Sequence, residues 1–161
     1  MHELGIAQAF LGATIEAAGE RRVCEVHVGI GTLNGVVDDS LAFGFELLAE
    51  GTPAAGAALT VRVIRARTRC SDCSEEHELR AMPPVCAGCG SMSVTFVAGR
   101  ELILEEVVLA GDPPERMRVG VEVDEQADGH THDHHHHDHG NDQRHDVLAM
   151  GTVRAGSWPF D

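Results

Sequence analysis

The sequence Cys70-Ser-Asp-Cys73 is followed, after twelve residues, by a second pair with the same spacing, Cys86-Ala-Gly-Cys89. Two residues between the cysteines of a pair allow a tight turn to direct both sulfur atoms toward one point. Two such pairs supply four thiolates, which Zn²⁺ binds tetrahedrally at about 2.3 Å in structural sites. The spacing therefore predicts a zinc module built around these four cysteines.

Other chemistry is open to four cysteines. Two disulfides or free buried thiols are alternatives, although the paired spacing and a reducing compartment disfavour both. Four sulfurs also suit iron, which would colour the protein, whereas zinc would not. A site closed by four thiolates leaves no coordination position for water or substrate, so we expect a structural metal. The sequence shows no recognisable pair of nucleophile and base, and we do not expect an enzyme.

The composition describes a small acidic protein. The chain has 161 residues, enough for one domain with a small appendage, and its formal net charge is −14 at pH 7. Such a charge repels nucleic acid and attracts cations or basic protein surfaces. The N-terminus lacks a basic signal-peptide region, and no run of about eighteen apolar residues could span a membrane. We therefore expect a cytoplasmic protein with neither nucleic-acid nor membrane partners.

Hydrophobic periodicity predicts two helices and four strands. The helices are expected over 3–18 and from a cap at Asp38 or Asp39 to a stop at Gly51, and the strands over 22–30, 59–67, 94–97 and 101–109. Alternation in the first strand places Cys24, a small buried hydrophobe, on the apolar face with Val26, Val28 and Ile30, and Val23 on the outer face with Glu25 and His27. We expect an α+β fold in which two helices cover a three-stranded sheet.

These elements imply three parts. Residues 1–68 with 98–110 are expected to form an α/β domain that carries the N-terminus, and residues 69–97 the zinc module. Residues 111–161 are polar and acidic, so we expect a disordered tail with at most a brief strand over 118–123. Between the cysteine pairs, His77 could hydrogen-bond a zinc thiolate.

The first three residues, Met1-His2-Glu3, place a free amine, backbone amides and an imidazole close together. A metal there could close one chelate ring from the amine to the His2 amide and another from that amide to the imidazole, and the Glu3 amide could complete a square. Square-planar nitrogen donors suit Ni(II) or Cu(II) rather than zinc. The alternative is that His2 is incidental and that Glu3 is favoured only by its place at a helix N-terminus.

Eight of the eleven histidines lie near the C-terminus, interleaved with aspartates. They are His130, His132, His134, His135, His136, His137, His139 and His145. Neutral imidazole binds zinc, copper and nickel alike, and such a run offers many overlapping sites, which suits a metal store better than a selective site. A purification tag and a purely solvating tail are the alternatives, although no six histidines are contiguous and sixteen residues follow His145.

Several features together resemble one known family. Met1-His2-Glu3-Leu4 opens an amphipathic helix, residues 31–37 read GTLNGVV before a second helix, and a C-x2-C…C-x2-C-Gly-Ser pattern precedes Gly99-Arg100-Glu101-Leu102. In this order, over residues 1 to about 109, the sequence resembles the HypA/HybF family of hydrogenase maturation nickel chaperones.

The resemblance implies that His2 and the adjoining backbone nitrogens bind Ni(II) as cargo, with Glu3 assisting, and that the four cysteines hold structural Zn(II). It implies two partners, a HypB-type GTPase and the large-subunit precursor of nickel–iron hydrogenase, with urease maturation factors as further candidates. The final fifty residues depart from the family, so the histidine-rich store is expected from the residues alone. The alternative function is a zinc-ribbon module for protein interaction, for instance in transcription.

Overall fold

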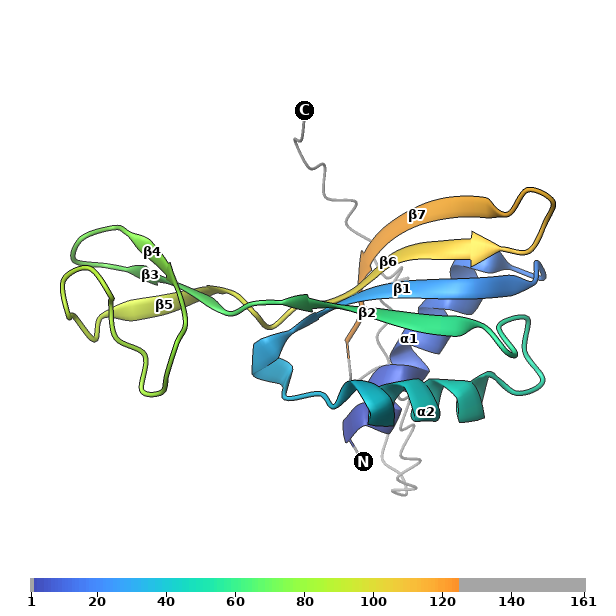
Figure 1. Cartoon of the computed structure of the whole chain (residues 1–161), viewed down its shortest axis with the longest axis horizontal. Coiled ribbons are helices and arrows are strands. Elements are labelled where there is room, and N and C mark those ends of the chain that lie inside the picture. Colours follow the sequence, from blue (N-terminus) through green and yellow to red (C-terminus); the bar gives the residue numbers. More distant parts are fainter. Residues whose placement is uncertain (1, 125–161) are drawn as a thin grey trace, which may run out of the picture. The chain divides into compact units, whose positions relative to one another are not determined.

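The computed structural model describes residues 2–124, apart from the side chain of His2. Within this part the chain forms two α-helices, one short 3-10 helix and seven strands, which build two sheets (Figure 1). In chain order the elements are α1 (His2–Ala18), β1 (Val23–Gly31), η1 (Thr32–Asn34), α2 (Asp38–Ala49), β2 (Ala58–Ile64), β3 (Arg67–Cys70), β4 (Glu76–Glu78), β5 (Val94–Ala98), β6 (Leu102–Leu109) and β7 (Glu115–Glu122). The expected α+β class is confirmed.

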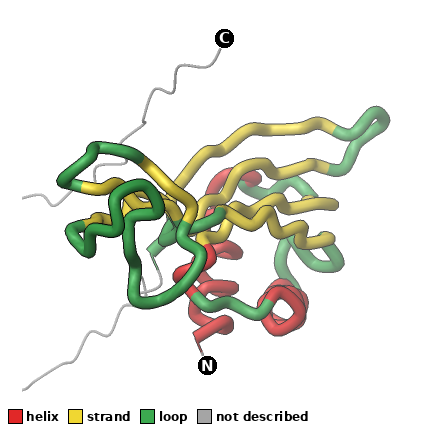
Figure 2. Tube along the Cα trace, turned by 60° about the vertical axis from the view of Figure 1, so that its left-hand side comes forward, coloured by secondary structure: helices red, strands yellow, loops and turns green. Residues whose placement is uncertain are grey.

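The larger sheet has four strands in the order β2-β1-β6-β7. β1 and β2 are parallel, and the other two neighbouring pairs are antiparallel. Both helices lie on one side of this sheet (Figures 1 and 2), where they form the core with its inner face. The largest fully buried side chains are Phe10, Phe45, Ile6, Leu41 and Leu104. Burial of such side chains, each worth about 1.5–3 kcal/mol, holds the helices on the sheet.

Both expected helices are present. At the end of α1, Gly19 adopts a left-handed conformation (φ 63°) and its amide donates to the Ile15 carbonyl at 2.8 Å. Glycine does so without a Cβ penalty, so α1 ends at Ala18, where the expected helix over 3–18 also ends. The predicted cap of α2 is wrong, because Val37 is the capping residue and Asp38 and Asp39 lie in the first turn. Neither helix of the described chain is long and apolar enough to cross a membrane.

The expected number of strands in the larger sheet is wrong, because β7 adds a fourth. β7 pairs antiparallel with β6 from Leu109↔Glu115 to Ile103↔Glu122. Its Met117 and Val119 pack partly buried against the core. The expected tail therefore begins too early at residue 111, and the remaining tail residues, 125–161, lie outside the described part of the chain.

The predicted alternation of β1 side chains between the core face and the outer face of the sheet is wrong at the start of the strand. The register with β6 shifts between Val23 and Glu25, which leaves Cys24 as an extra residue. Such a bulge moves side chains before it to the opposite face of the sheet. Val23 is therefore buried in the core at 1% exposure, whereas Cys24 is half-buried and its thiol donates to the Val108 carbonyl at 3.3 Å.

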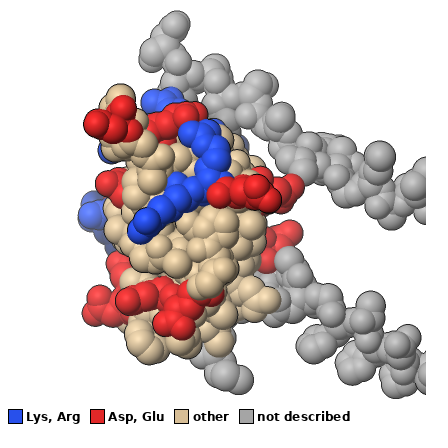
Figure 3. All heavy atoms as spheres, turned by 90° about the vertical axis from the view of Figure 1, so that its right-hand side faces the viewer, with Lys and Arg blue, Asp and Glu red and all other residues tan. Residues whose placement is uncertain are grey.

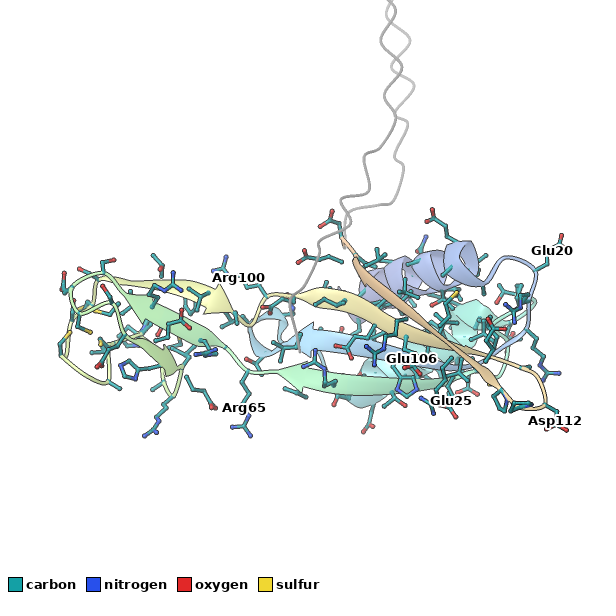
Figure 4. The ribbon with its side chains drawn as sticks, turned by 90° about the horizontal axis from the view of Figure 1, so that it is seen from above. Glu20, Glu25, Arg65, Arg100, Glu106 and Asp112 are labelled. Carbon is teal, nitrogen blue, oxygen red and sulfur yellow. The ribbon has the colours of Figure 1, made fainter. Side chains whose placement is uncertain are left out.

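The smaller sheet has the order β4-β3-β5, and both of its pairs are antiparallel. β5 confirms the strand expected near 94–97, whereas β4 was not expected. The single strand predicted over 59–67 is in fact two, because the chain leaves β2 after Ile64 and enters the smaller sheet at Arg67. Residues 65–101 therefore form an excursion between β2 and β6, and Arg65 and Arg100 lie near its two ends (Figure 4).

The two ends of this excursion meet at a close crossing of backbones. A Cβ on Gly99 would lie 2.5 Å from the Cα of Ala66, and Gly99 has a φ of 109° that only glycine adopts readily.

The hydroxyl of Thr32 accepts a hydrogen bond from the Ala66 amide at 3.0 Å. The Asn34 side-chain amide donates to the carbonyls of Gly31 and Glu101, both at 3.2 Å. The η1 turn thus ties the end of β1 to both connections of the smaller sheet.

Candidate metal centre

The four cysteine sulfurs of the smaller sheet converge on one point. All four Sγ atoms lie within 4.8 Å of one another. The Sγ atoms of Cys70 and Cys89 are 3.7 Å apart, and those of Cys73 and Cys86 are 3.5 Å apart. Four sulfurs at about 2.3 Å from a tetrahedral Zn²⁺ would be about 3.8 Å from each other. The four cysteines therefore fit a structural zinc ion in both donor type and spacing.

The two cysteine pairs fold into equivalent turns. In each, the amide four residues after the first cysteine donates to the carbonyl of that cysteine at 3.0 Å. The residues at this position are Ser74 (φ 63°) and Gly90 (φ 77°), and both are left-handed. The first cysteine of each pair also donates its amide to the carbonyl five residues later, at 2.9 and 2.8 Å. The same backbone geometry therefore presents both pairs of sulfurs.

Backbone amides near the sulfurs shift the thiol pKa values. The amides of Cys89 and Gly88 lower the pKa of Cys86 to about 6, against the opposing effect of burial. The Glu75 amide lowers the pKa of Cys73. The hydrogen bond between the thiols of Cys73 and Cys86, together with burial, outweighs this effect and raises the pKa of Cys73 to about 12. The thiols therefore share protons unequally, and a bound metal would release those that remain.

The cysteines differ in exposure. Cys70, at the end of β3, and Cys86 are buried at 2% and 3% exposure. Cys73 is half-buried and Cys89 is exposed. Among the described residues these four form the one group of three or more histidine, cysteine or acidic side chains close enough to share an ion. The cluster is therefore buried at Cys70 and Cys86 and open to solvent at Cys89.

The predicted hydrogen bond from His77 to a thiolate is not present within residues 2–124. Instead, His77 Nε2 lies 3.2 Å from Glu75 Oε2, without hydrogen-bond geometry. A Cβ on Gly88 would lie 3.3 Å from this nitrogen and 2.4 Å from the same carboxylate oxygen. The side chains of His77 and Glu75 therefore pack against the second cysteine turn, and glycine leaves the space that they fill.

The predicted N-terminal metal site is placed only through its backbone. α1 begins at His2, so the amides of His2 and Glu3 lie in the first turn, where helix amides have no intrahelical acceptor. Glu3 is half-buried. Met1 and the His2 side chain lie outside the described residues, as do all eight histidines of the C-terminal segment.

Thr32 and Asn34 are structural residues that the sequence analysis missed. They lie in the stretch GTLNGVV, which falls between the first expected strand and the second expected helix. The Asn34-Gly35 dipeptide is a turn signal, and Gly35 is left-handed with a φ of 64°. It indicates a turn but not the partners of the Thr32 and Asn34 side chains, because these come from residues 66 and 101.

The fold and the cysteine cluster define a small two-part metal-binding protein, in which a four-cysteine module is inserted between two strands of an α/β unit. The family model described as HypA, hydrogenase/urease nickel incorporation, metallochaperone, matches residues 1–109. The chain belongs to this HypA family.

Individual relatives agree with the family match. Hydrogenase maturation factor HypA of Geotalea daltonii is 37% identical over 102 residues, which cover 63% of this chain and 93% of that protein. Its counterpart in Geotalea uraniireducens is 38% identical over 107 residues, covering 66% and 97%. The solution structure of the Ni metallochaperone HypA from Helicobacter pylori has a TM-score of 0.51 and 25% identity, and covers 66% of this chain and 96% of that one.

Proposed function

We propose that this chain binds Ni(II) at Met1, His2 and Glu3 and delivers it to the large-subunit precursor of nickel–iron hydrogenase. Family membership carries the proposal, because the matched residues 1–109 include both the N-terminus and the four cysteines. The start of α1 at His2 supports it, since the first amides of a helix are not committed to intrahelical bonds. Handing over an ion breaks no substrate bond, so the chain acts as a carrier rather than an enzyme.

The donor set suits a metal that must be released. The terminal amine, the amides of His2 and Glu3 and the His2 imidazole would form a square of nitrogens around Ni(II). A square-planar ion at a chain end is open above and below its plane. Incoming thiolates of an acceptor can approach through these faces, and transfer then proceeds by ligand exchange.

Zn(II) has a different role in this proposal. The cysteine cluster provides four ligands and no open position, so the ion would fix the module rather than take part in delivery. The smaller sheet with its cysteines is the zinc module, and α1, α2 and the larger sheet form the nickel-binding domain.

The histidine-rich segment is proposed to hold reserve nickel. His130, His132, His134–His137, His139 and His145 offer imidazoles without a single fixed geometry. Such sites would be several and weak, in contrast to one ordered site at the terminus. Equal nickel stoichiometry for the full chain and for a chain ending at Asp124 would contradict the store.

The proposed partners are a HypB-type GTPase and the hydrogenase precursor, and urease maturation factors are candidates because the family model covers urease as well. All of this work would take place in the cytoplasm, where reduced thiols suit a cysteine-bound zinc.

The test is Ni(II) titration of a chain ending at Asp124 with its native N-terminus. A chain that ends at Asp124 retains β7 and therefore the whole four-stranded sheet. We expect one Ni(II) per chain with a square-planar absorption band, and loss of both in His2→Ala. His27→Ala is the matched control, because His27 lies on β1 and should not affect the terminus. Equal binding by all three proteins would show that the terminus is not the site.

A further inference from the structure

The outer face of α2 carries an apolar pair that the fold leaves uncovered. Phe43 is 68% exposed and Leu47 is 54% exposed. They are four residues apart and therefore lie one turn apart on the same side of the helix. Phe10 and Phe45, by contrast, are fully buried. Exposed aromatic and aliphatic side chains that lie together are typical of protein interfaces.

Unpaired acids surround this pair. Asp39 and Glu46 are exposed and share the helix side of Phe43 and Leu47, and Glu50, also exposed, directly follows the last residue of α2. Within the described chain, none of these three carboxylates has an ion-pair partner. Residues 23–57 contain no arginine or lysine at all. We call these five residues the α2 stripe.

The α2 stripe lies near the first turn of α1. Leu4 is 43% exposed, and its Cδ1 would lie 3.5 Å from a Cβ at Gly44, the neighbour of Phe43 in α2. Leu4 is two residues from His2. A protein docked on the α2 stripe would therefore be close to the N-terminus of the chain.

We propose that the α2 stripe docks the protein that accepts nickel, through an apolar surface on that protein rimmed by lysine or arginine. The apolar pair supplies the buried centre of the contact, and the unpaired carboxylates select a basic rim. This inference rests on the proposed function, because it identifies the acceptor as the partner that must reach the terminal nickel. It assigns recognition to α2 and metal transfer to residues 1–3.

Other occupants match the α2 stripe less well. A second copy of this chain would have to offer its arginines, but most of those on the strands and their connections are already paired within the described chain, with Arg118 on β7 as an exception. The pairs are Arg62–Glu105, Arg65–Glu78, Arg67–Glu76, Arg69–Glu76 and Arg116–Glu106. Figure 3 shows basic atoms bordered by acidic ones in its upper half, and an acidic cluster without basic neighbours below. Residues 125–161 hold seven acids and two arginines, so they too are repelled, as is an anionic membrane.

The test measures binding of the full-length chain to the purified, nickel-free large-subunit precursor of nickel–iron hydrogenase from the same organism. The variant Phe43→Ser with Leu47→Ser should bind about tenfold more weakly or worse, because it removes the apolar centre. Glu46→Arg should also weaken binding and reduce its dependence on salt. Val63→Ser is the matched control, since Val63 is equally exposed at 54% but lies on β2, and its binding should equal that of the wild type.

The outcomes separate this inference from the proposed function. The square-planar absorption band of nickel at the terminus should be unchanged in all of these variants, whereas His2→Ala should lose this band but still bind the precursor. If His2→Ala retained the square-planar band, the proposed function would fail and docking would be judged by binding alone. Unchanged binding of the α2 variants, or no binding of the precursor by the wild type, would overturn the inference.

Discussion

Ser74 and Gly90 occupy equivalent left-handed positions in the two cysteine turns, but only Ser74 has a side chain. Glycine at Gly90 meets this requirement without cost, whereas Ser74 carries a Cβ at a φ of 63°. The first turn is therefore the more strained of two otherwise equivalent turns.

Replacing Ser74 tests this difference. Ser74→Gly should raise the free energy of unfolding of the zinc-loaded protein by about 0.5 kcal/mol, because relief of strain exceeds the added freedom of the unfolded chain. Gly90→Ala should lower it by about 1 kcal/mol. Urea unfolding in the presence of zinc measures both, and Ala87→Gly, in the exposed middle of the second turn, is the control. Equal destabilisation by Ser74→Gly and Gly90→Ala would disprove the comparison.

The ion pair between Arg21 and Glu115 joins the end of α1 to β7, with Arg21 Nη2 2.5 Å from Glu115 Oε2. The hydrogen bond from Arg21, followed by its charge, lowers the pKa of Glu115 below its ordinary value of 4.5. A carboxyl with a lowered folded pKa stabilises the fold above its unfolded pKa and loses that contribution as the pH falls through the folded value.

Glu115→Gln should therefore be less stable than the wild type at neutral pH, by a small amount because both side chains are exposed. The difference in unfolding free energy should disappear as the pH falls below 4.5. Urea unfolding of both proteins between pH 7 and pH 3 measures it. A difference that stays constant across this range would show that the charge of Glu115 contributes nothing.

Among the elements, the η1 turn hydrogen-bonds the segments that connect the two sheets. Thr32 and Asn34 connect the end of β1 to Ala66 and Glu101 across the junction of the two sheets. Thr32→Val should leave the buried Ala66 amide without its acceptor and lower the free energy of unfolding by about 1 kcal/mol. Asn34→Ala should cost about 1–2 kcal/mol because it removes two bonds.

Thermal unfolding measures these losses, and Thr60→Val is the matched control because Thr60 is exposed on β2. Hydrogen exchange of the Ala66 amide provides a second reading, and it should accelerate in Thr32→Val alone. Unchanged exchange at Ala66 would mean that the Thr32 hydroxyl does not hold this connection.

At the scale of the whole molecule, the two sheets differ in what holds them together. The core beneath the larger sheet includes fully buried side chains from both helices, β1 and β6. The buried residues of the smaller sheet and its turns are Ala66, Thr68, Cys70 and Cys86. An apolar core this small does not offset the entropy of ordering three strands, and a metal bound by the four cysteines would supply the difference.

Zinc removal should therefore act locally. With a chelator present, amide signals of residues 67–98 should collapse, while those of Val28 and Leu104 in the larger sheet should persist. Added zinc should restore the native spectrum. Two-dimensional NMR of the chelated and reloaded protein measures both, and cooperative loss of all signals would contradict the separation.

The features predicted correctly from sequence are local. The cysteine spacing, the end of α1 at residue 18 and the apolar periodicity of both helices depend on neighbours within a few residues. The failures depend on distant partners. β7 forms because β6 offers an edge, the bulge at Cys24 is set by pairing with Val108, and Thr32 finds its partner at Ala66. Periodicity carries no information on such pairing.

The meeting of Ala66 and Gly99 also has a kinetic consequence. β2 and β6 are separated by the thirty-seven residues 65–101, and both must add to β1 for the larger sheet to form. A zinc ion that gathers the four cysteines early in folding would close the loop between Cys70 and Cys89 and shorten this path about twofold, which removes about 0.6 kcal/mol of loop-closure entropy. A zinc ion bound by the four cysteines would thus speed the pairing of strands that it does not touch, and refolding of the larger sheet should be faster with zinc than without it.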